Sequence, residues 1–125
     1  YIVLYIKIYS TIQKEASMNV QIKKGLLEYC VLAQLYRGES YGYQLIKDIS
    51  TCIDISESTL YPILKRLEAD NYVKTYKVEH NNRLRCYFQL TESGKLHLKN
   101  FIKERTEIIR VLDFISERKE INEHE

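Results

Sequence analysis

Apolar residues recur at helical spacing in two neighbouring stretches of the first half of the chain. The first stretch runs from Val20 to Arg37, and its repeating positions are Ile22, Leu26, Tyr29, Cys30, Ala33 and Tyr36, widened by Leu27, Leu32 and Leu35. This pattern predicts a first helix that is buried on much of its surface. Gly38 follows Arg37 and predicts a left-handed end for the helix.

The second stretch predicts a helix from Tyr41 to about Thr51. Ser40 comes just before it and can cap its first turn. Gly42 lies near its start, where a missing side chain lets another element approach closely. The side chains expected to face inward are Leu45, Ile46 and Ile49.

A third helix is expected to begin between Ser56 and Ser58 and to end near Asp70. Its inward stripe is Leu60, Ile63, Leu64 and Leu67. With Ser58 as the N-cap, Pro62 lies at the end of the first turn, where backbone N–H groups have no helical partner. If the helix begins at Ser56 instead, a bend at Pro62 is expected.

The next segment has the pattern of a β-hairpin. Residues 72–79 alternate and are rich in valine and tyrosine, and residues 84–90 are expected to form the returning strand. His80, Asn81 and Asn82 lie between them, and asparagine tolerates the left-handed backbone of a tight turn.

The last stretch predicts a long helix from a cap at Thr91 to about Glu120, with Glu92 in its first turn. Its apolar residues follow a heptad-like pattern that is interrupted at Arg105. Because little of the domain remains for this helix to pack against, we expect a second copy of the chain to cover it. The residues predicted to form this homodimer contact are Leu98, Phe101, Ile102, Ile108, Ile109, Leu112 and Ile115.

The order of elements is therefore three helices, a hairpin and a long helix. This order predicts a mainly α fold with a small β-hairpin, namely a winged helix-turn-helix followed by a long C-terminal dimerisation helix. The predicted parts are an extension at 1–17, a DNA-binding domain at 18–91 and the dimerisation helix at 92–125. Met18 is the expected natural start; alternatively, residues 1–17 form a true arm that packs on the domain or its partner.

In such a fold the third helix enters the major groove of double-stranded DNA with its outward face. Hydroxyls and free backbone N–H groups at a helix start suit phosphate oxygens, and basic residues one turn later reach phosphate or guanine. The alternative is an ordinary solvated helix face. The predicted DNA-binding residues of this helix are Ser56, Ser58, Thr59, Tyr61, Pro62, Lys65 and Arg66, joined by Arg83 and Arg85 of the hairpin and by Lys23 and Lys24.

Composition narrows the function classes. The net charge of +2 and the pI of about 8.4 are too mild to establish a nucleic-acid partner. Neither the three cysteines nor the three histidines have the spacing of a metal or redox site, and Cys30 is expected in the core. We predict no cofactor and no metal. We also predict no enzyme activity, because no nucleophile–base pair, carboxylate pair or phosphate loop is evident. Tyr1–Tyr9 is too short to span a bilayer, and free thiols favour a cytoplasmic protein.

Several runs resemble the PadR family of transcription regulators. They are Gly25-Leu26-Leu27-Glu28, Tyr41-Gly42-Tyr43, Ser58-Thr59-Leu60-Tyr61-Pro62-x-Leu64-x-Arg66-Leu67-Glu68, Arg83-x-Arg85-x-Tyr87 and Leu90-Thr91-Glu92-x-Gly94. The resemblance covers roughly residues 20–95 and implies a homodimer that binds a palindromic operator, usually as a repressor. In the family the long last helix is the dimerisation element.

The chain departs from this family at three points. Asn81-Asn82 stands where a glycine-rich wing tip is common, and Cys86 stands at a position that is often basic. Some relatives bind drugs through tryptophan, which this chain lacks, so no effector is assigned and Tyr29, Tyr36 and Phe101 are expected to pack in the core. The same fold also serves replication terminators and protein-interaction modules, which are the alternative functions.

Overall fold

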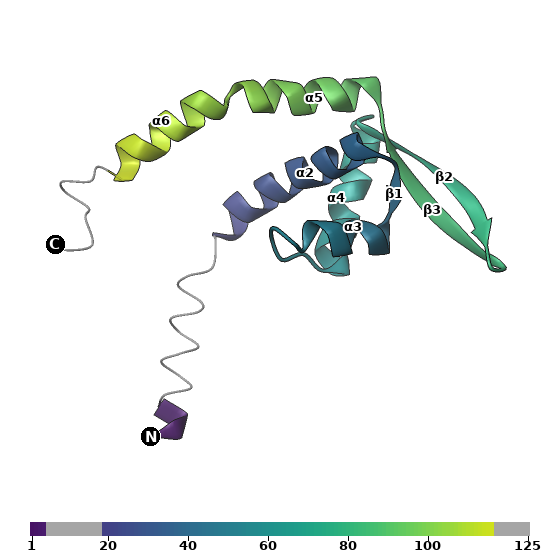
Figure 1. The fold of residues 1–125 in the computed structure, drawn as a ribbon, viewed down its shortest axis with the longest axis horizontal. Coiled ribbons are helices and arrows are strands. Elements are labelled where there is room, and N and C mark those ends of the chain that lie inside the picture. Colours follow the sequence, from purple (N-terminus) through teal and green to yellow (C-terminus); the bar gives the residue numbers. More distant parts are fainter. Residues whose placement is uncertain (5–18, 117–125) are drawn as a thin grey trace.

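The computed structural model describes residues 1–4 and 19–116 (Figure 1). Its main elements are α2 (Val20–Arg37), β1 (Ser40–Tyr41), α3 (Gly42–Ile49), α4 (Glu57–Ala69), β2 (Val73–His80), β3 (Arg83–Leu90), α5 (Glu92–Lys103) and α6 (Arg105–Ser116). This order confirms the predicted winged helix-turn-helix, with α3 and α4 as the two helices of the motif and β2–β3 as the wing. Met18 and most of the predicted extension lie outside the described residues.

Helix α2 has the predicted bounds but buries only part of the predicted stripe. Its fully buried side chains are Leu27, Val31, Leu32 and Leu35, whereas Ile22 is 58% exposed and Tyr36 is 51% exposed. The prediction was therefore correct for Leu27, Leu32 and Leu35, and wrong for Ile22 and for the core position expected for Tyr36. A helix with apolar residues over most of its surface offers more than one possible inner face, and periodicity alone does not choose between them.

The end of α2 also differs from the prediction. Gly38 has φ 160° and ψ 157°, which is extended backbone and not the left-handed cap expected of a glycine here. Its N–H donates to the carbonyl of Leu35 at 3.2 Å, and the chain then passes straight into β1. The short strand pairs with β3, and this pairing sets the extended geometry.

Ser40 lies in strand β1 and does not cap α3. It is buried and pairs with Phe88, while Tyr41 pairs with Tyr87 and occupies the cap position without a side-chain cap bond. Helix α3 therefore begins at Gly42, and Leu45 and Ile49 are buried as predicted, with Ile46 packed beside the core. The close approach predicted at Gly42 is confirmed, because a Cβ there would collide with the Tyr61 ring.

Helix α4 begins after Ser56 and buries the predicted stripe of Leu60, Ile63, Leu64 and Leu67. With this start Pro62 lies in the second turn, where its ring nitrogen cannot donate to the carbonyl of Ser58. The bend expected for this start stays a prediction.

The sheet has the strand order β1-β3-β2, with β3 in the centre. Strands β2 and β3 pair from Val73↔Leu90 to His80↔Arg83, so that a two-residue turn connects them. Its residues Asn81 and Asn82 have φ values of 50° and 64°, which confirms the predicted left-handed turn. The inner end of the hairpin contributes Val73, Phe88 and Leu90 to the core.

The predicted continuous last helix is wrong, because it is divided at Glu104. The N–H of Glu104 donates to the carbonyl of Phe101 at 3.0 Å, a tighter turn that ends α5 one residue before the interruption noted at Arg105. The predicted cap is confirmed, since the Thr91 hydroxyl accepts from the N–H of Gly94 at 3.0 Å. In Figure 1, α5 passes over α2 on the side opposite α3 and α4, and α6 extends beyond the domain. The predicted residues beyond Ser116 lie outside the described part.

Candidate nucleic-acid interface

The start of α4 carries a cluster of three hydroxyls. The Ser56 Oγ lies 3.0 Å from the Ser58 Oγ and 3.2 Å from the Thr59 Oγ1. Because the Ser56 hydroxyl bonds to these neighbours, it does not cap the helix, and the first backbone N–H groups of α4 have no side-chain acceptor. Free N–H groups at a positive helix end together with exposed hydroxyls suit the binding of a phosphate oxygen.

The two lysines of α2 lie beside this cluster. Lys23 and Lys24 line a hollow of about 430 Å³ together with Ser56 and Thr59. A neighbouring hollow of about 250 Å³ is lined by Lys24 and Pro62, among other residues. The fold thus brings ammonium groups from α2 to the start of α4, as the predicted set of DNA-binding residues requires.

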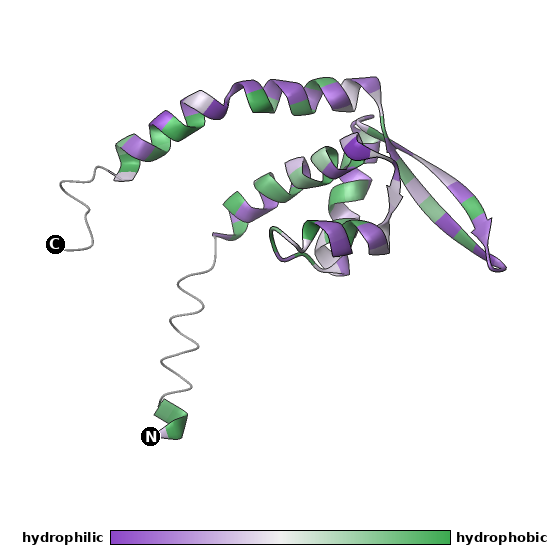
Figure 2. Ribbon diagram, viewed as in Figure 1, coloured by the Kyte–Doolittle hydropathy of each residue, from purple (hydrophilic) through white to green (hydrophobic). Residues whose placement is uncertain are grey.

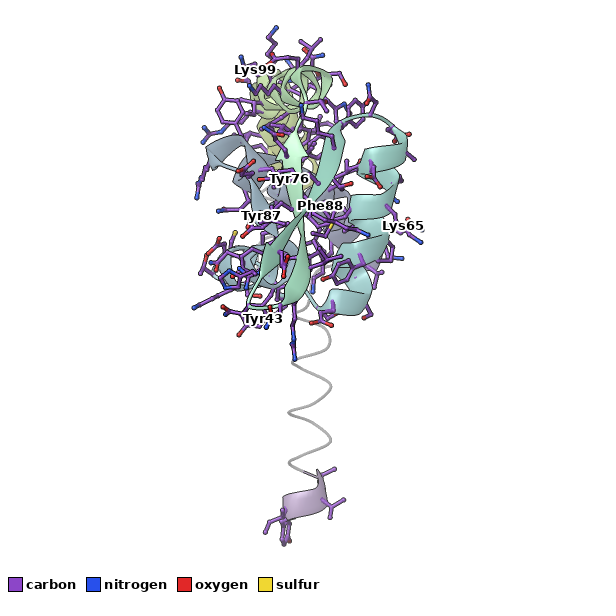
Figure 3. All side chains as sticks on the ribbon, turned by 90° about the vertical axis from the view of Figure 1, so that its right-hand side faces the viewer. Tyr43, Lys65, Tyr76, Tyr87, Phe88 and Lys99 are labelled. Atoms are coloured by element: carbon purple, nitrogen blue, oxygen red, sulfur yellow. The ribbon has the colours of Figure 1, made fainter. Side chains whose placement is uncertain are left out.

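The outward side of α4 carries its aromatic and basic residues. Tyr61, Pro62, Lys65 and Arg66 are all exposed, whereas the leucines of the same helix are buried. Lys65 points away from the body of the domain in Figure 3. The sequence prediction that this face is polar and accessible is therefore confirmed.

Arg66 differs from Lys65 because it already has a partner. Its Nη2 lies 3.2 Å from Oε2 of Glu28 on α2, with the arginine side chain 54% exposed and the glutamate 20% exposed. An exposed pair of this kind contributes at most about 1 kcal/mol to stability. Arg66 therefore links α4 to α2, and a phosphate would have to share or replace this contact. Glu28 was not predicted as a partner of Arg66 from the sequence, although both residues belong to the runs that resemble the family.

A groove of about 850 Å³ separates the wing from the two helices of the motif. Gly42, Tyr43 and Tyr61 line its helical side. The wing side is lined by His80, Arg83 and Arg85, among others, and no carboxylate from residues 19–116 lines the groove. Both predicted wing arginines thus lie along the groove that Tyr61 also lines.

An aromatic contact holds the Arg85 side chain in position. Its guanidinium carbon lies 4.1 Å from the centroid of the Tyr41 ring, within the range of a cation–π interaction. Tyr41 was quoted in the family-like Tyr-Gly-Tyr run but was not predicted as a site residue. The position of Tyr41 directly before Gly42, where a close approach was predicted, was the signal that could have identified it as a site residue.

The predicted dimerisation residues fall into two groups. Leu98 is only 6% exposed and belongs to the core of its own domain, and Phe101 stacks on Tyr29 with ring centroids 3.8 Å apart. These two residues are therefore engaged within the chain. The other predicted residues are exposed, namely Ile102, Ile108, Ile109, Leu112 and Ile115. Val111 and Phe114 are also exposed, although they were not among the predicted residues.

The remaining chemistry of the described residues is limited. Cys30 is half-buried beside the core as expected, and burial raises the pKa of its thiol. Residues 1–4 and 19–116 contain no group of three metal-ligating side chains close enough to hold an ion. Every helix in the same ranges is too short or too polar to cross a membrane.

Comparison with known proteins identifies the family. A sequence model of the transcriptional regulator PadR-like family matches residues 31–100, which is more than half of the chain. This range contains α3, α4, the wing and most of α5.

Solved structures agree with this match. A PadR-like transcription factor from Bacteroides fragilis is 30% identical and superposes with a TM-score of 0.68, over 76% of this chain and 94% of that one. A transcriptional regulator from Clostridium thermocellum is 29% identical with a TM-score of 0.69, over 78% and 96% of the two chains. Bacillus subtilis PadR in complex with operator DNA shares the fold, with 24% identity and a TM-score of 0.58 over 62% and 46%. This chain therefore belongs to the PadR-like family and is a DNA-binding transcriptional regulator, not an enzyme.

Proposed function

We propose that the protein is a repressor that binds a palindromic operator as a homodimer in the cytoplasm. The observation that carries the proposal is the unburied apolar surface of α6, a helix with no buried residue. Its exposed apolar side chains are Ile108, Ile109, Val111, Leu112, Phe114 and Ile115. Figure 2 shows hydrophobic residues distributed along α6 beyond the end of the domain.

A second copy of the chain is the partner that this surface suits best. Exposed apolar residues Val20, Ile22 and Leu26 lie on α2, the helix over which α5 passes (Figure 1). Contiguous exposed apolar surface of this kind marks an interaction site. In a two-fold dimer the same patches are used twice, so α6 of each copy would cover α2 or α6 of the other.

A two-fold dimer presents two copies of α4 to DNA. Each copy would enter the major groove with the exposed face that contains Lys65, while the hydroxyl cluster of Ser56, Ser58 and Thr59 meets the backbone. The two half-sites would then be inverted repeats, separated by a whole number of helical turns. The structure of Bacillus subtilis PadR with operator DNA supports the general placement of such a domain on a duplex. Occupation of a promoter by this dimer would repress transcription.

Binding-site selection from random DNA tests the proposal. We expect a consensus of two inverted half-sites, and we expect an in vitro transcript from a promoter containing it to decrease when the protein is added. A single asymmetric site would contradict the dimer, and an increased transcript would contradict repression. Binding to a protein that persists at high salt, with no selected DNA, would favour an interaction module, since phosphate-driven affinity falls steeply with salt.

A further inference from the structure

The wing groove contains an arginine that is oriented before any ligand arrives. The Arg85 guanidinium carbon lies over the Tyr41 ring at 4.1 Å from its centroid, and this side chain makes no ion pair or side-chain hydrogen bond within residues 19–116. A cation–π contact uses the positive charge of the guanidinium and leaves its N–H donors for a ligand. Arg83 is exposed beside the wing turn and has no such contact in the same part of the chain.

The Tyr41 ring is itself held by neighbouring aromatic rings. It meets Tyr87 edge to face at 5.6 Å, and Tyr87 stacks on Tyr76 at 5.5 Å with an interplanar angle of 12°. The strand register places the three tyrosines opposite one another across β1, β3 and β2. Figure 3 shows Tyr76 and Tyr87 on the face of the sheet that is turned toward the viewer.

Glu39 acts on Tyr76, at the β2 end of this row. Its carboxylate raises the pKa of Tyr76 to about 12. Glu39 directly precedes β1, the strand that carries Tyr41. The Tyr41 ring is therefore held by the aromatic row of the hairpin, and the Arg85 guanidinium lies over this ring.

The groove beside Arg85 has the chemistry of a phosphate site. Its polar side chains include the arginines 83 and 85, His80 and the hydroxyls of Tyr43 and Tyr61, and the described part of the chain contributes no acidic residue to it. Strand β1 covers β3 only at Tyr87 and Phe88, so the edge of β3 toward the tip has no strand beside it in the described chain. A planar guanidinium matches the geometry of a phosphate diester through paired N–H donors.

We propose that Arg85 is a preformed contact for one backbone phosphate of the DNA and that Tyr41 is its positioning residue. This proposal rests on the proposed function, because it places one DNA strand in the groove between the wing and Tyr61. Arg83 is then the wing arginine left free to adjust to the neighbouring minor groove. Orienting Arg85 in the free protein removes part of the entropy cost of ordering it on binding.

The test measures how affinity depends on salt for Arg85→Gln and Tyr41→Leu, with Tyr41→Phe as the matched control. The probes are duplex poly(dA-dT) and the duplex recovered by binding-site selection. Loss of one phosphate contact should lower affinity about tenfold and reduce the slope of log affinity against log salt by about 0.9. Arg85→Gln should show both changes. Tyr41→Leu should weaken binding several-fold although it removes no charge, and Tyr41→Phe, which keeps the ring, should bind like wild type.

The double variant distinguishes positioning from a general structural effect. If Tyr41 acts through Arg85, then Tyr41→Leu should not weaken binding further once Arg85→Gln is present. Additive losses, or an unchanged salt slope in Arg85→Gln, would overturn the proposal. Should Tyr41→Leu fail to fold by circular dichroism, the slope for Arg85→Gln still decides whether the contact exists. Failure of the wild-type protein to select any DNA would refute the proposed function instead.

Discussion

The winged-helix body and the α6 arm both contain many apolar residues, but the body buries them and the arm leaves them exposed. In the body, each helix from α2 to α5 contributes to one core that also includes Val73, Phe88 and Leu90 of the wing. In α6 no residue is buried, and Phe114 is 78% exposed. The two regions differ in what surrounds them more than in how apolar they are, because the body folds on itself and the arm extends away from it (Figure 1).

The boundary between these regions lies inside the segment that the sequence presents as one helix. Helix α5 belongs to the body, since Gly94 packs against the backbone of Tyr72 and Leu98 is buried. After the turn at Glu104 the chain loses these contacts. Truncation after Glu92 would therefore remove part of the core together with the arm, whereas truncation after Glu104 would remove the arm alone.

The same leucine-to-alanine change on either side of Glu104 gives the largest contrast. Leu98→Ala leaves a cavity in the core and should lower the free energy of unfolding by about 2–5 kcal/mol at every protein concentration. Leu112 is 57% exposed, so Leu112→Ala should instead act on association. Its effect on the midpoint of urea unfolding should disappear on dilution to concentrations at which the wild type is also a monomer. Equal and concentration-independent losses in both variants would show that α6 packs on its own domain.

Adding charge to the arm should separate assembly from folding. In the double variant Val111→Asp and Phe114→Asp, two exposed apolar side chains become anionic, so the dimer should dissociate while the core is unchanged. Affinity for a duplex with two half-sites should fall on the order of 100-fold, because the two domains are no longer linked. Light scattering gives the mass and a mobility-shift assay gives the affinity. A variant that remains a dimer would place the interface elsewhere.

A charge reversal on α4 should have the converse effect. Lys65→Glu should weaken DNA binding by about tenfold or more without changing the dimer or the unfolding midpoint, since this side chain points into solvent. The matched control is Lys99→Glu, which makes the same change on α5, at the end of the domain away from Tyr43 in Figure 3. Unchanged affinity in Lys65→Glu, or an equal loss in both variants, would remove this face of α4 from the interface.

Sequence reasoning predicted best where a single face of an element is apolar. The stripe of α4 was correct because its aliphatic residues Leu60, Ile63, Leu64 and Leu67 lie on one face and most of its other positions are polar, so only one inner face is possible. On α2 apolar residues occur on several faces, and the chosen stripe included Ile22 and Leu26, which are exposed. The exposed and the buried apolar residues of α2 fit the helical period equally well. Which of them are buried depends on the elements that pack against the helix.

Features that depend on contacts between residues far apart in the chain could not be predicted from the sequence. Strand β1 has two residues, too few for any alternation, and exists because β3 offers an edge to pair with. Exposure was predicted correctly for residues whose orientation follows from helical phase, such as Lys65. The prediction did not find the roles of Tyr41 or Glu28, because their partners Arg85 and Arg66 lie far away in sequence and meet them only after folding.

The smallest expected effect is a change in the titration of Tyr76, on the exposed face of the sheet. It tests whether this residue of the body has a fixed partner, unlike the exposed residues of the arm. The carboxylate of Glu39 raises the pKa of Tyr76 to about 12, above the usual value of about 10. Because the folded-state pKa is the higher one, the stabilisation from this interaction is complete below about pH 10 and is lost as the pH rises through 12. At about pH 11 the Tyr76 phenol should stay mostly protonated, whereas in Glu39→Gln it should be mostly ionised. Carbon-13 NMR of labelled tyrosine, with the signal assigned by Tyr76→Phe, measures this difference, and identical titration curves in the two proteins would show that Glu39 does not hold Tyr76.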